Sequence, residues 1–217
     1  MAVRAMLAEL AHLYEARTAV PVRVESVGGV DAERRVRDGE ALDFVVLARD
    51  AIDRLASAGR VDPDSRVDLA LSRMAVAIRD GIPRPAIDSE EGVRDAILAA
   101  RTIGYSTGPS GRHLMDLLAR WGIDGAVASR LVQAPPGIGV GALLARGDAD
   151  IGFQQASEFL GVQGIEVLGP LPDAIQSVTV FAGAVGTNAA SPGAARDFLA
   201  WLASDAAAGA KQRNAMA

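Results

Sequence analysis

The chain has 217 residues, of which half are apolar, and a formal net charge of −5 at pH 7. This length can bury a large core in one domain or in two lobes. The acidic balance, without any cluster of Lys and Arg, argues against a nucleic-acid partner, although a small anion can still bind where backbone N–H groups set the local field. No apolar run approaches the roughly 20 residues that span a bilayer, so we expect no integral membrane segment.

Cysteine is absent, and His12 and His113 are the two histidines. The composition therefore excludes disulfides, thiolate metal sites, a cysteine nucleophile and a multi-histidine metal site. We expect no metal and no cofactor. Met1 leads directly into an amphipathic pattern, so this sequence shows no signal peptide.

The first third of the chain predicts alternating helices and strands. It opens with one apolar helical face, formed by Val3, Met6, Leu7, Leu10 and Tyr14. We then expect a strand at Val20–Val24, a turn at 26–29, and a helix that Asp31 caps and Gly39 ends. Strands are expected at 44–47 and 74–78, with a helix at 51–58 between them.

The middle of the chain continues the alternation after a linker-like stretch, Asp80–Pro85, that contains two prolines. Ser89 is expected to cap a helix with Glu90 and Glu91 in its first turn. The elements expected next are a strand at 103–105, a helix from Ser110 to Gly122, a short helix at 124–130, a strand at 132–133, a helix that Gly147 stops, and a strand at 151–155.

The last third begins with a strand at 166–168, followed by a second proline-containing stretch at 169–172. A strand is expected at 176–182. Pro192 follows the capping Ser191 at the start of a helix, and the Ala-rich tail is expected to form one more helix that frays at Asn214. This alternation favours an α/β fold with mostly parallel sheets. The two proline stretches predict lobe 1 as residues 1–82 plus 173–217, and lobe 2 as residues 83–172.

The stretch from Ile103 to Met115 has the chemistry of an anion site. A short strand ends in Tyr105, Ser106 and Thr107, and a turn with a second hydroxyl, Ser110, leads into an amphipathic helix. Exposed N–H groups and the positive end of the helix dipole suit a bound anion at such a helix start. Arg112 could add a bidentate partner for a carboxylate. The alternative is a plain helix cap with a surface arginine.

Three segments resemble type II periplasmic substrate-binding proteins of the molybdate-binding-like group. They are Gly147–Glu158 (GDADIGFQQASE), Asp38–Leu47 (DGEALDFVVL), and Val167–Pro172 (VLGPLP) followed by Ile175, Gln176 and a Thr-Val-Phe strand. The resemblance covers nearly the whole chain. It implies two α/β lobes joined by two hinge crossings, with a ligand cleft between the lobes.

The resemblance also implies a function. Members bind small oxyanions or organic acids through N–H groups and hydroxyls, and present them to an ABC-type permease. We therefore favour a substrate-binding protein that captures a small anion and is not an enzyme. A bacterial aconitate isomerase resembles the same group, so isomerisation of an unsaturated tricarboxylate is the alternative. A cytosolic sensor domain is a third interpretation, ranked last. The resemblance implies a periplasmic or extracytoplasmic location, and the missing signal peptide leaves a cytoplasmic one open.

Site residues follow from the resemblance by position. The family's loop of hydroxyl and glycine falls on Gly28 and Gly29, and its anion-facing helix start falls on Ser110 and Gly111. A tyrosine that contacts the oxyanion in molybdate binders falls on Gln155, which favours a ligand with more hydrogen-bonding groups. The third loop falls near Gly137 and Ile138. Together with Ser106 and Arg112, these are the expected ligand-binding residues.

Several positions keep alternative interpretations. Strand alternation allows only one of Gln154 and Gln155 to face a given side. For His113 and Tyr105 structural roles are favoured, and Asp148 with Asp150 suggests a turn rather than a metal site. An isomerase needs a base, and no spacing selects one among His113, Glu158 and Tyr105.

One departure from the family is larger. Its members begin with a strand and a serine-bearing loop before the first helix, whereas Met1 starts at that helix. The first strand and its ligand contacts are therefore expected to be absent from this chain, through truncation or because the strand is supplied otherwise.

Overall fold

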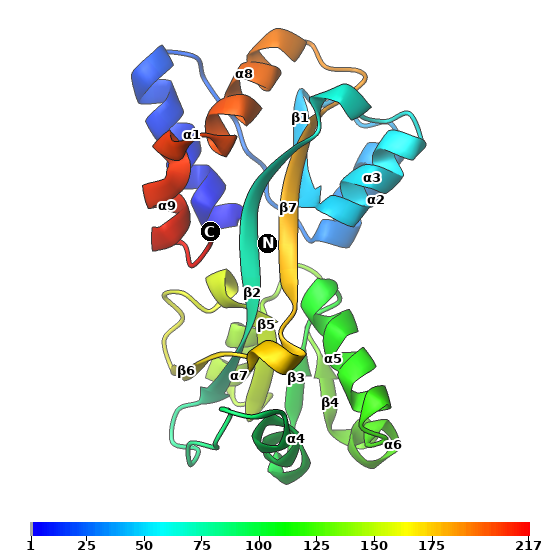
Figure 1. The fold of residues 1–217 in the computed structure, drawn as a ribbon, viewed down its shortest axis with the longest axis vertical. Coiled ribbons are helices and arrows are strands. Elements are labelled where there is room, and N and C mark those ends of the chain that lie inside the picture. The colour runs from blue at the N-terminus through cyan, green and yellow to red at the C-terminus, as the bar shows by residue number, and fades with distance from the viewer. Residues whose placement is uncertain (1) are drawn as a thin grey trace. The chain divides into compact units, whose positions relative to one another are not determined.

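The computed structural model describes residues 2–217 as a mixed α/β protein (Figure 1). Its contacts divide the chain into two compact units: unit 1 holds the residues up to Ser72 together with Thr179–Ala217, and unit 2 holds Arg73–Val178. The expected limits at 82 and 172 differ from these because the chain passes between the units inside two strands. Both proline stretches lie within unit 2, where they follow or end strands.

Unit 1 is built on strands β1 (Phe44–Ala48), β7 (Val178–Val185) and the first part of β2 (Val67–Arg79). β7 lies between the other two, and it pairs with β1 in antiparallel register, with Val46 opposite Gly183. A Cβ at residue 183 would lie 2.5 Å from a methyl group of Leu199. Glycine there lets helix α8 (Pro192–Ala203) pack directly on β7.

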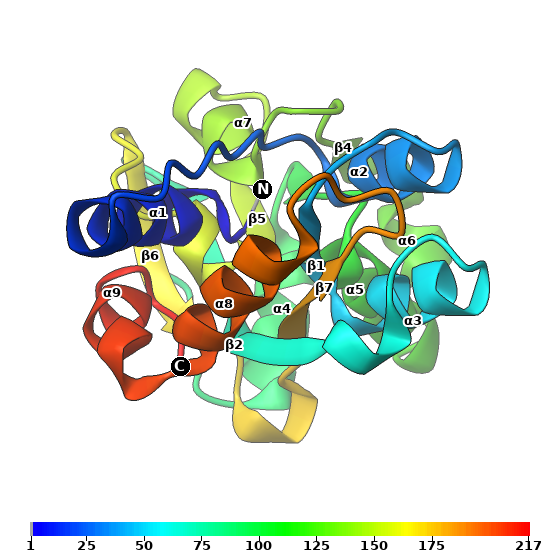
Figure 2. The same ribbon diagram turned by 90° about the horizontal axis from the view of Figure 1, so that it is seen from above.

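Two groups of helices cover these strands (Figure 2). Helices α1 (Arg4–Thr18), α8 and α9 (Ala208–Arg213) share one core, in which the rings of Tyr14 and Phe198 are 5.0 Å apart at 67°. All five apolar residues expected on the first helical face are buried. Helices α2 (Gly29–Arg37) and α3 (Arg49–Ser57) share a second core with β1, through Val36, Ile52 and Leu55.

Two expectations in unit 1 are wrong. Val20–Val24 forms no strand: it runs without ladder pairs, Val22 and Val24 pack against the first core, and the Val22 N–H donates to Glu15 Oε1 at 2.6 Å. The side chain replaces the backbone partner that a strand would need. Asn214 does not fray, because its side-chain amide donates to Glu9 Oε2 at 2.9 Å and to Ala210 O at 2.8 Å.

Unit 2 is built on a mixed sheet rather than a mostly parallel one. β5 (Ile151–Gln155) lies between the second part of β2 and β3 (Ile103–Tyr105), and β3 also pairs with β4 (Leu131–Gln133). The pairs of β3 with β4 and β5 are parallel. β2 runs antiparallel to both β5 and β6 (Ile165–Pro170), because it enters the unit from the opposite direction.

Helices cover both faces of the β4–β3–β5 strands (Figure 1). Helices α4 (Glu90–Ala99), α5 (Pro109–Arg120) and α6 (Asp124–Val127) share a core with Ile103, Ile151 and Phe153. Helix α7 (Val140–Arg146) covers the other face, where a Cβ at Gly152 would lie 2.4 Å from Val140 Cγ1. Glycine on this face brings α7 close to the strands.

Most helix ends follow the expected signals. Ser89 Oγ accepts from the Gly92 N–H at 3.1 Å, and Gly122 and Gly147 take the positive φ values, 67° and 80°, that stop α5 and α7. Two expected caps differ. Helix α2 starts at Gly29, so Asp31 lies in the first turn rather than at the cap, and Ser191 holds the N-cap position of α8 without a side-chain cap hydrogen bond.

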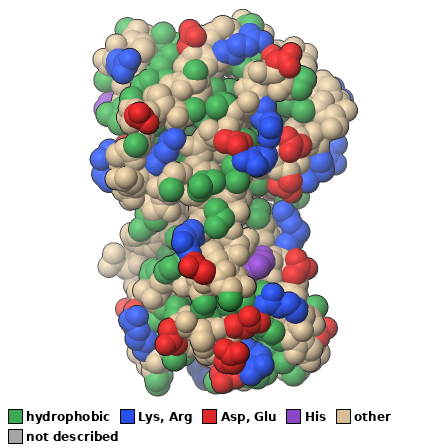
Figure 3. Space-filling view, in the orientation of Figure 1, with side chains coloured by type: hydrophobic (Ala, Val, Ile, Leu, Met, Phe, Trp, Pro, Cys, Tyr) green, Lys and Arg blue, Asp and Glu red, His purple; other side chains and the backbone are tan. Residues whose placement is uncertain are grey.

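Acidic and basic side chains are interspersed over the face shown in Figure 3. Arg54, for example, binds both Glu33 and Asp50, and Arg35 binds both Glu25 and Glu40. Among residues 2–217, no helix combines the length and apolar character needed to cross a membrane.

Candidate functional site

The carboxyl ends of three parallel strands meet at one edge of unit 2. Tyr105 on β3 lies opposite Gln133 on β4 and Phe153 on β5, so Ser106 and Gln154 follow at the same level. Ligands in α/β folds bind outside this edge, because the loops that leave it can be shaped without disturbing the sheet. The candidate site is therefore assembled from the loops after β3, β4 and β5.

The loop after β3 holds a pair of serine hydroxyls. Ser106 Oγ and Ser110 Oγ are 3.0 Å apart, and Ser106 Oγ also accepts from the Gly108 N–H at 3.3 Å. Ser110 is 2% exposed. The pair lies at the start of α5, whose first residue is Pro109, a residue that suits this position because it has no N–H to leave unsatisfied.

Gly111 makes this arrangement possible. A Cβ at residue 111 would lie 1.6 Å from the carbonyl oxygen of Ser106, so only glycine lets the first turn of α5 approach the end of β3 this closely. Arg112 is exposed, and its N–H donates to Gly108 O at 3.1 Å. The structure thus brings Ser106, Ser110, Gly111 and Arg112 together around one helix start.

The two glutamines at the end of β5 point to opposite faces of the strand. Phe153 packs in the core with α5, whereas Gly152 faces α7, so the alternation directs Gln155 to the α5 side and Gln154 to the α7 side. Both residues are 2% exposed. Gln155 therefore lies on the face of the sheet that α5 covers.

Gln154 forms a network that the sequence did not reveal. Its Oε1 accepts from the Val140 N–H at 2.7 Å, and its Nε2 donates to Glu158 Oε2 at 2.6 Å. Glu158 ends the 3₁₀ helix Ala156–Glu158, directly after β5. Burial raises the pKa of the Glu158 carboxyl. Strand alternation is the sequence signal that could have predicted this contact. Gly152 and Gln154 are two residues apart, so both lie on the face of β5 that α7 covers.

The third loop is partly closed by its own hydrogen bonds. Gly137 has φ 78°, a turn conformation that favours glycine, and the Ile138 N–H donates to Pro135 O at 3.0 Å. The Gln154 side chain takes the first N–H of α7. In the loop after β4, the backbone N–H groups of Ile138 and Val140 therefore already donate hydrogen bonds within the protein.

Gly28 and Gly29 belong to unit 1, where they form the N-cap and the first residue of α2. Neither has a positive φ, and a Cβ at either position would meet only ordinary contacts. These two glycines could therefore contact a ligand only through the backbone N–H groups at the start of α2, which lie next to the Asp31 carboxylate.

Other polar residues singled out from the sequence have structural roles. His113 Nε2 donates to Ile175 O at 2.8 Å, and the Tyr105 hydroxyl donates to Gln133 Oε1 at 3.2 Å. Asp150 is 5% exposed and binds Arg79 at 3.2 Å and Arg101 at 3.0 Å. Burial acts to raise the pKa of Asp150, but the two arginines outweigh it and hold that pKa below its ordinary value. No metal-binding cluster of acidic and histidine side chains occurs in the described part of the chain.

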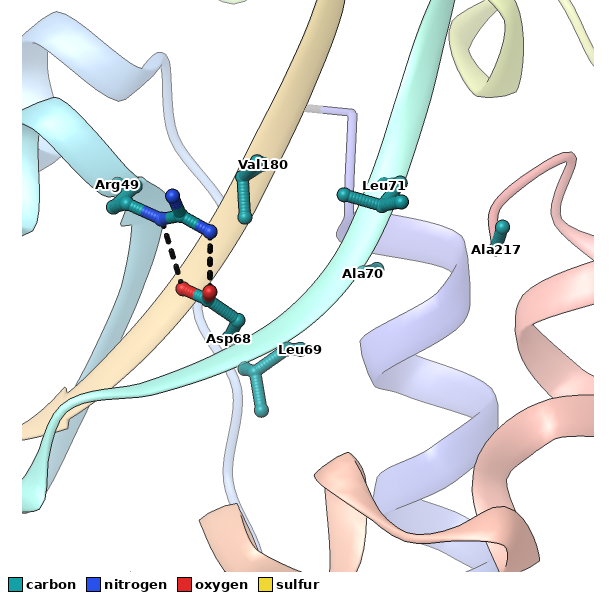
Figure 4. Close-up of a pocket in the computed structure, with 7 residues that line it drawn as sticks. All are labelled: Arg49, Asp68, Leu69, Ala70, Leu71, Val180 and Ala217. Atoms are coloured by element: carbon teal, nitrogen blue, oxygen red, sulfur yellow. Dashed lines mark hydrogen bonds and ion pairs between the residues drawn. The ribbon is translucent and has the colours of Figure 1, made fainter.

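A surface pocket of about 290 Å³ lies in unit 1 (Figure 4). It is lined mainly by apolar side chains, and Arg49 pairs across it with Asp68, with Nε donating to Oδ1 at 3.0 Å. Because this ion pair satisfies the charges of the pocket internally, the strand edge of unit 2 is the stronger candidate site.

Comparison with known proteins shows what this chain resembles. The family model of bacterial extracellular solute-binding proteins matches residues 1–216. An aconitate isomerase from a Pseudomonas species is 36% identical over 208 residues, which are 92% of this chain and 78% of that protein.

Solved structures share the fold at low identity. The periplasmic molybdate-binding protein of Azotobacter vinelandii superposes with a TM-score of 0.83 at 19% identity, covering 99% of this chain and 95% of its own. The binding protein AgtB from A. tumefaciens R10, in complex with agropinic acid, has a TM-score of 0.74 at 13% identity, covering 99% and 78%. The fold is that of type II periplasmic binding proteins, and the chain belongs to the family of bacterial extracellular solute-binding proteins.

Proposed function

We propose that this protein is an extracytoplasmic solute-binding protein that binds a small organic acid at the strand edge of unit 2 and presents it to an ABC-type permease. The observation that carries the proposal is the pair of hydroxyls, Ser106 and Ser110, fixed at the N-terminus of the 12-residue helix α5. One hydroxyl of the pair donates to the other, so the second hydroxyl and the first N–H groups of the helix are the donors for a carboxylate. Gly111 keeps these donors close to the end of β3.

An organic acid suits the site better than molybdate for two reasons. Gln155 stands where the molybdate binders have a tyrosine, and an amide can both donate to and accept from a ligand that carries hydroxyl or carboxyl groups. Among the similar proteins, one is an aconitate isomerase and one holds agropinic acid. Both names point to organic acids, which supports the same ligand class here.

Isomerisation of an aconitate-type tricarboxylate is the second candidate function. It is favoured by the aconitate isomerase that is 36% identical over 92% of the chain. The Ser106 and Ser110 hydroxyls would then stabilise the negative charge that develops during proton transfer. Binding of the acid is common to both candidates.

A thermal-shift panel tests the ligand class. We expect di- and tricarboxylates, including cis- and trans-aconitate, to raise the melting temperature, because a ligand at 100 times its Kd adds about 2.7 kcal/mol to the free energy of unfolding. Ser110→Ala should weaken binding about tenfold through the loss of a charge-assisted hydrogen bond, about 1.5 kcal/mol.

Ser57→Ala is the matched control, since Ser57 Oγ donates to its own helix at Asp53 O on the exposed surface of unit 1. Stabilisation by molybdate and not by carboxylates would contradict the proposal. Equal binding by the Ser110 variant and the control would remove the strand edge as the site.

A further inference from the structure

Glu158 lies at the strand edge of unit 2 in a fixed orientation. The Val140 N–H donates to Gln154 Oε1, so the opposite end of that amide, Nε2, is directed at Glu158 Oε2. The amide cannot turn over without losing both hydrogen bonds. Gln154 is thus a positioning residue for the Glu158 carboxyl.

The serine pair and this carboxyl are carried by segments that follow neighbouring strands, β3 and β5. Because Tyr105 pairs with Phe153, Ser106 leaves β3 one strand spacing, about 4.8 Å, from Gln154 on β5. A proton-transfer group and a set of anion-stabilising donors therefore leave neighbouring parallel strands at the same level. An enolate-forming reaction needs these two components side by side.

We propose that Glu158 is the proton-transfer residue for allylic isomerisation of an unsaturated tricarboxylate at this site. The proposal rests on the second candidate function above. Of the three possible bases that the sequence left open, Glu158 is the one that the Gln154 amide orients at the end of β5. His113 instead binds Ile175 O, and the Tyr105 hydroxyl binds Gln133.

The proposed reaction balances within the substrate and Glu158. The Glu158 carboxylate takes a proton from the methylene carbon, and the electron pair of that C–H bond forms a new double bond to the central carbon. The electrons of the former double bond move to the far carbon, which receives the proton back from the Glu158 carboxylic acid. No oxidant, reductant or second substrate takes part. The Ser106 and Ser110 hydroxyls and the α5 N–H groups would stabilise the intermediate negative charge.

Glu158→Gln tests the inference, because the glutamine oxygen can still accept from Gln154 while the proton-transfer group is lost. The full chain is incubated with cis-aconitate, the trans isomer is measured by chromatography, and binding of both isomers is measured by calorimetry. We expect kcat to fall by about 100-fold or more, with Kd changed by less than about threefold, since general acid–base catalysis contributes 10²- to 10⁴-fold. Glu158→Asp, which withdraws the carboxyl by one carbon, should retain intermediate activity and serves if the glutamine variant folds poorly.

Glu91→Gln is the matched control, because Glu91 is an exposed carboxylate in the first turn of α4. If the wild-type chain isomerises aconitate and Glu158→Gln does so at the same rate, Glu158 is not the proton-transfer residue and the isomerase function stands. If the wild-type chain binds aconitate but does not convert it, the isomerase function fails and the role of Glu158 fails with it, while the binding function stands.

Discussion

Two carboxyl groups at opposite ends of β5 show how burial and neighbouring charges act on single residues. Glu158 and Asp150 are both carboxyls of unit 2, yet their pKa values move in opposite directions: burial raises the pKa of Glu158, whereas Arg101 and Arg79 hold that of Asp150 low. Burial favours the protonated form of Glu158, whereas the two arginines favour the ionised form of Asp150 and make it a structural anion.

The raised pKa of Glu158 predicts a pH-dependent stability difference. Because the folded protein holds this proton more tightly than the unfolded chain does, the contribution of Glu158 to the free energy of unfolding is fully present below its ordinary pKa of 4.5 and is lost as pH rises through the folded pKa. Glu158→Gln has no such dependence. We expect it to melt above the wild-type protein at about pH 8, with the difference shrinking towards about pH 4. Thermal unfolding across this range measures it, and a difference of the opposite sign would contradict the burial argument.

Asp150 predicts the opposite dependence and a clear cost of substitution. Its lowered pKa means that its stabilisation is present above the ordinary value of 3.8 and is lost as pH falls through the folded pKa. Asp150→Asn should lower the free energy of unfolding by about 2 kcal/mol, through the loss of two charge-assisted hydrogen bonds in a buried position. The matched control is Asp173→Asn, whose side chain is 91% exposed in its pair with Arg73. Denaturant unfolding should show a change within about 0.5 kcal/mol for the control, and equal losses would show that burial is not the cause.

At the scale of elements, glycines set how closely the helices pack against the strands. Glycines at 111, 152 and 183 each stand where a Cβ would overlap a neighbouring backbone or side chain. The helices therefore contact the strands directly, and the strand-end loops are held by backbone geometry rather than by long side chains.

Gly111→Ala tests this for the start of α5. The added Cβ would meet Ser106 O at 1.6 Å, so α5 or the Ser106 loop must move. We expect a loss of about 3 kcal/mol or more in the free energy of unfolding, together with loss of ligand stabilisation in the thermal-shift panel. Gly193→Ala is the matched control: it also lies in the first turn of a helix that begins with proline, and a Cβ there meets nothing within 4 Å. The control should gain up to about 1 kcal/mol, and a neutral Gly111→Ala would refute the close-packing argument.

Elements also show where local sequence signals succeed. Ser89, Gly122 and Gly147 act as a cap and as stops because each works through its own backbone within one turn of helix. Val20–Val24 has the composition of a strand but no ladder partner, and Asn214 is held by Glu9 from the other end of the chain. A strand partner and the contact with Glu9 both depend on parts of the chain that are distant in sequence.

At the scale of the whole molecule, the family is established more firmly than the ligand. The family model matches nearly the whole chain, and the fold hosts both binding proteins and an aconitate isomerase among the proteins similar to it. Membership alone cannot choose between transport and chemistry, because function depends on site residues placed on the common fold. The choice rests on whether the chain only binds an organic acid or also converts it.

The sequence by itself determined the alternation of helices and strands, their glycine stops, the α/β class and the group of hydroxyls at the start of α5, because these depend on period, turn chemistry and nearest neighbours. It did not determine the antiparallel entry of β2, the passage between units inside strands, or the network of Gln154 with Glu158 and Val140. The first two features depend on pairing between residues far apart in the chain, and the third depends on the direction in which the Gln154 side chain leaves β5. Only the tertiary structure decides them, because strand pairing and side-chain direction are set by the packing of the complete sheet.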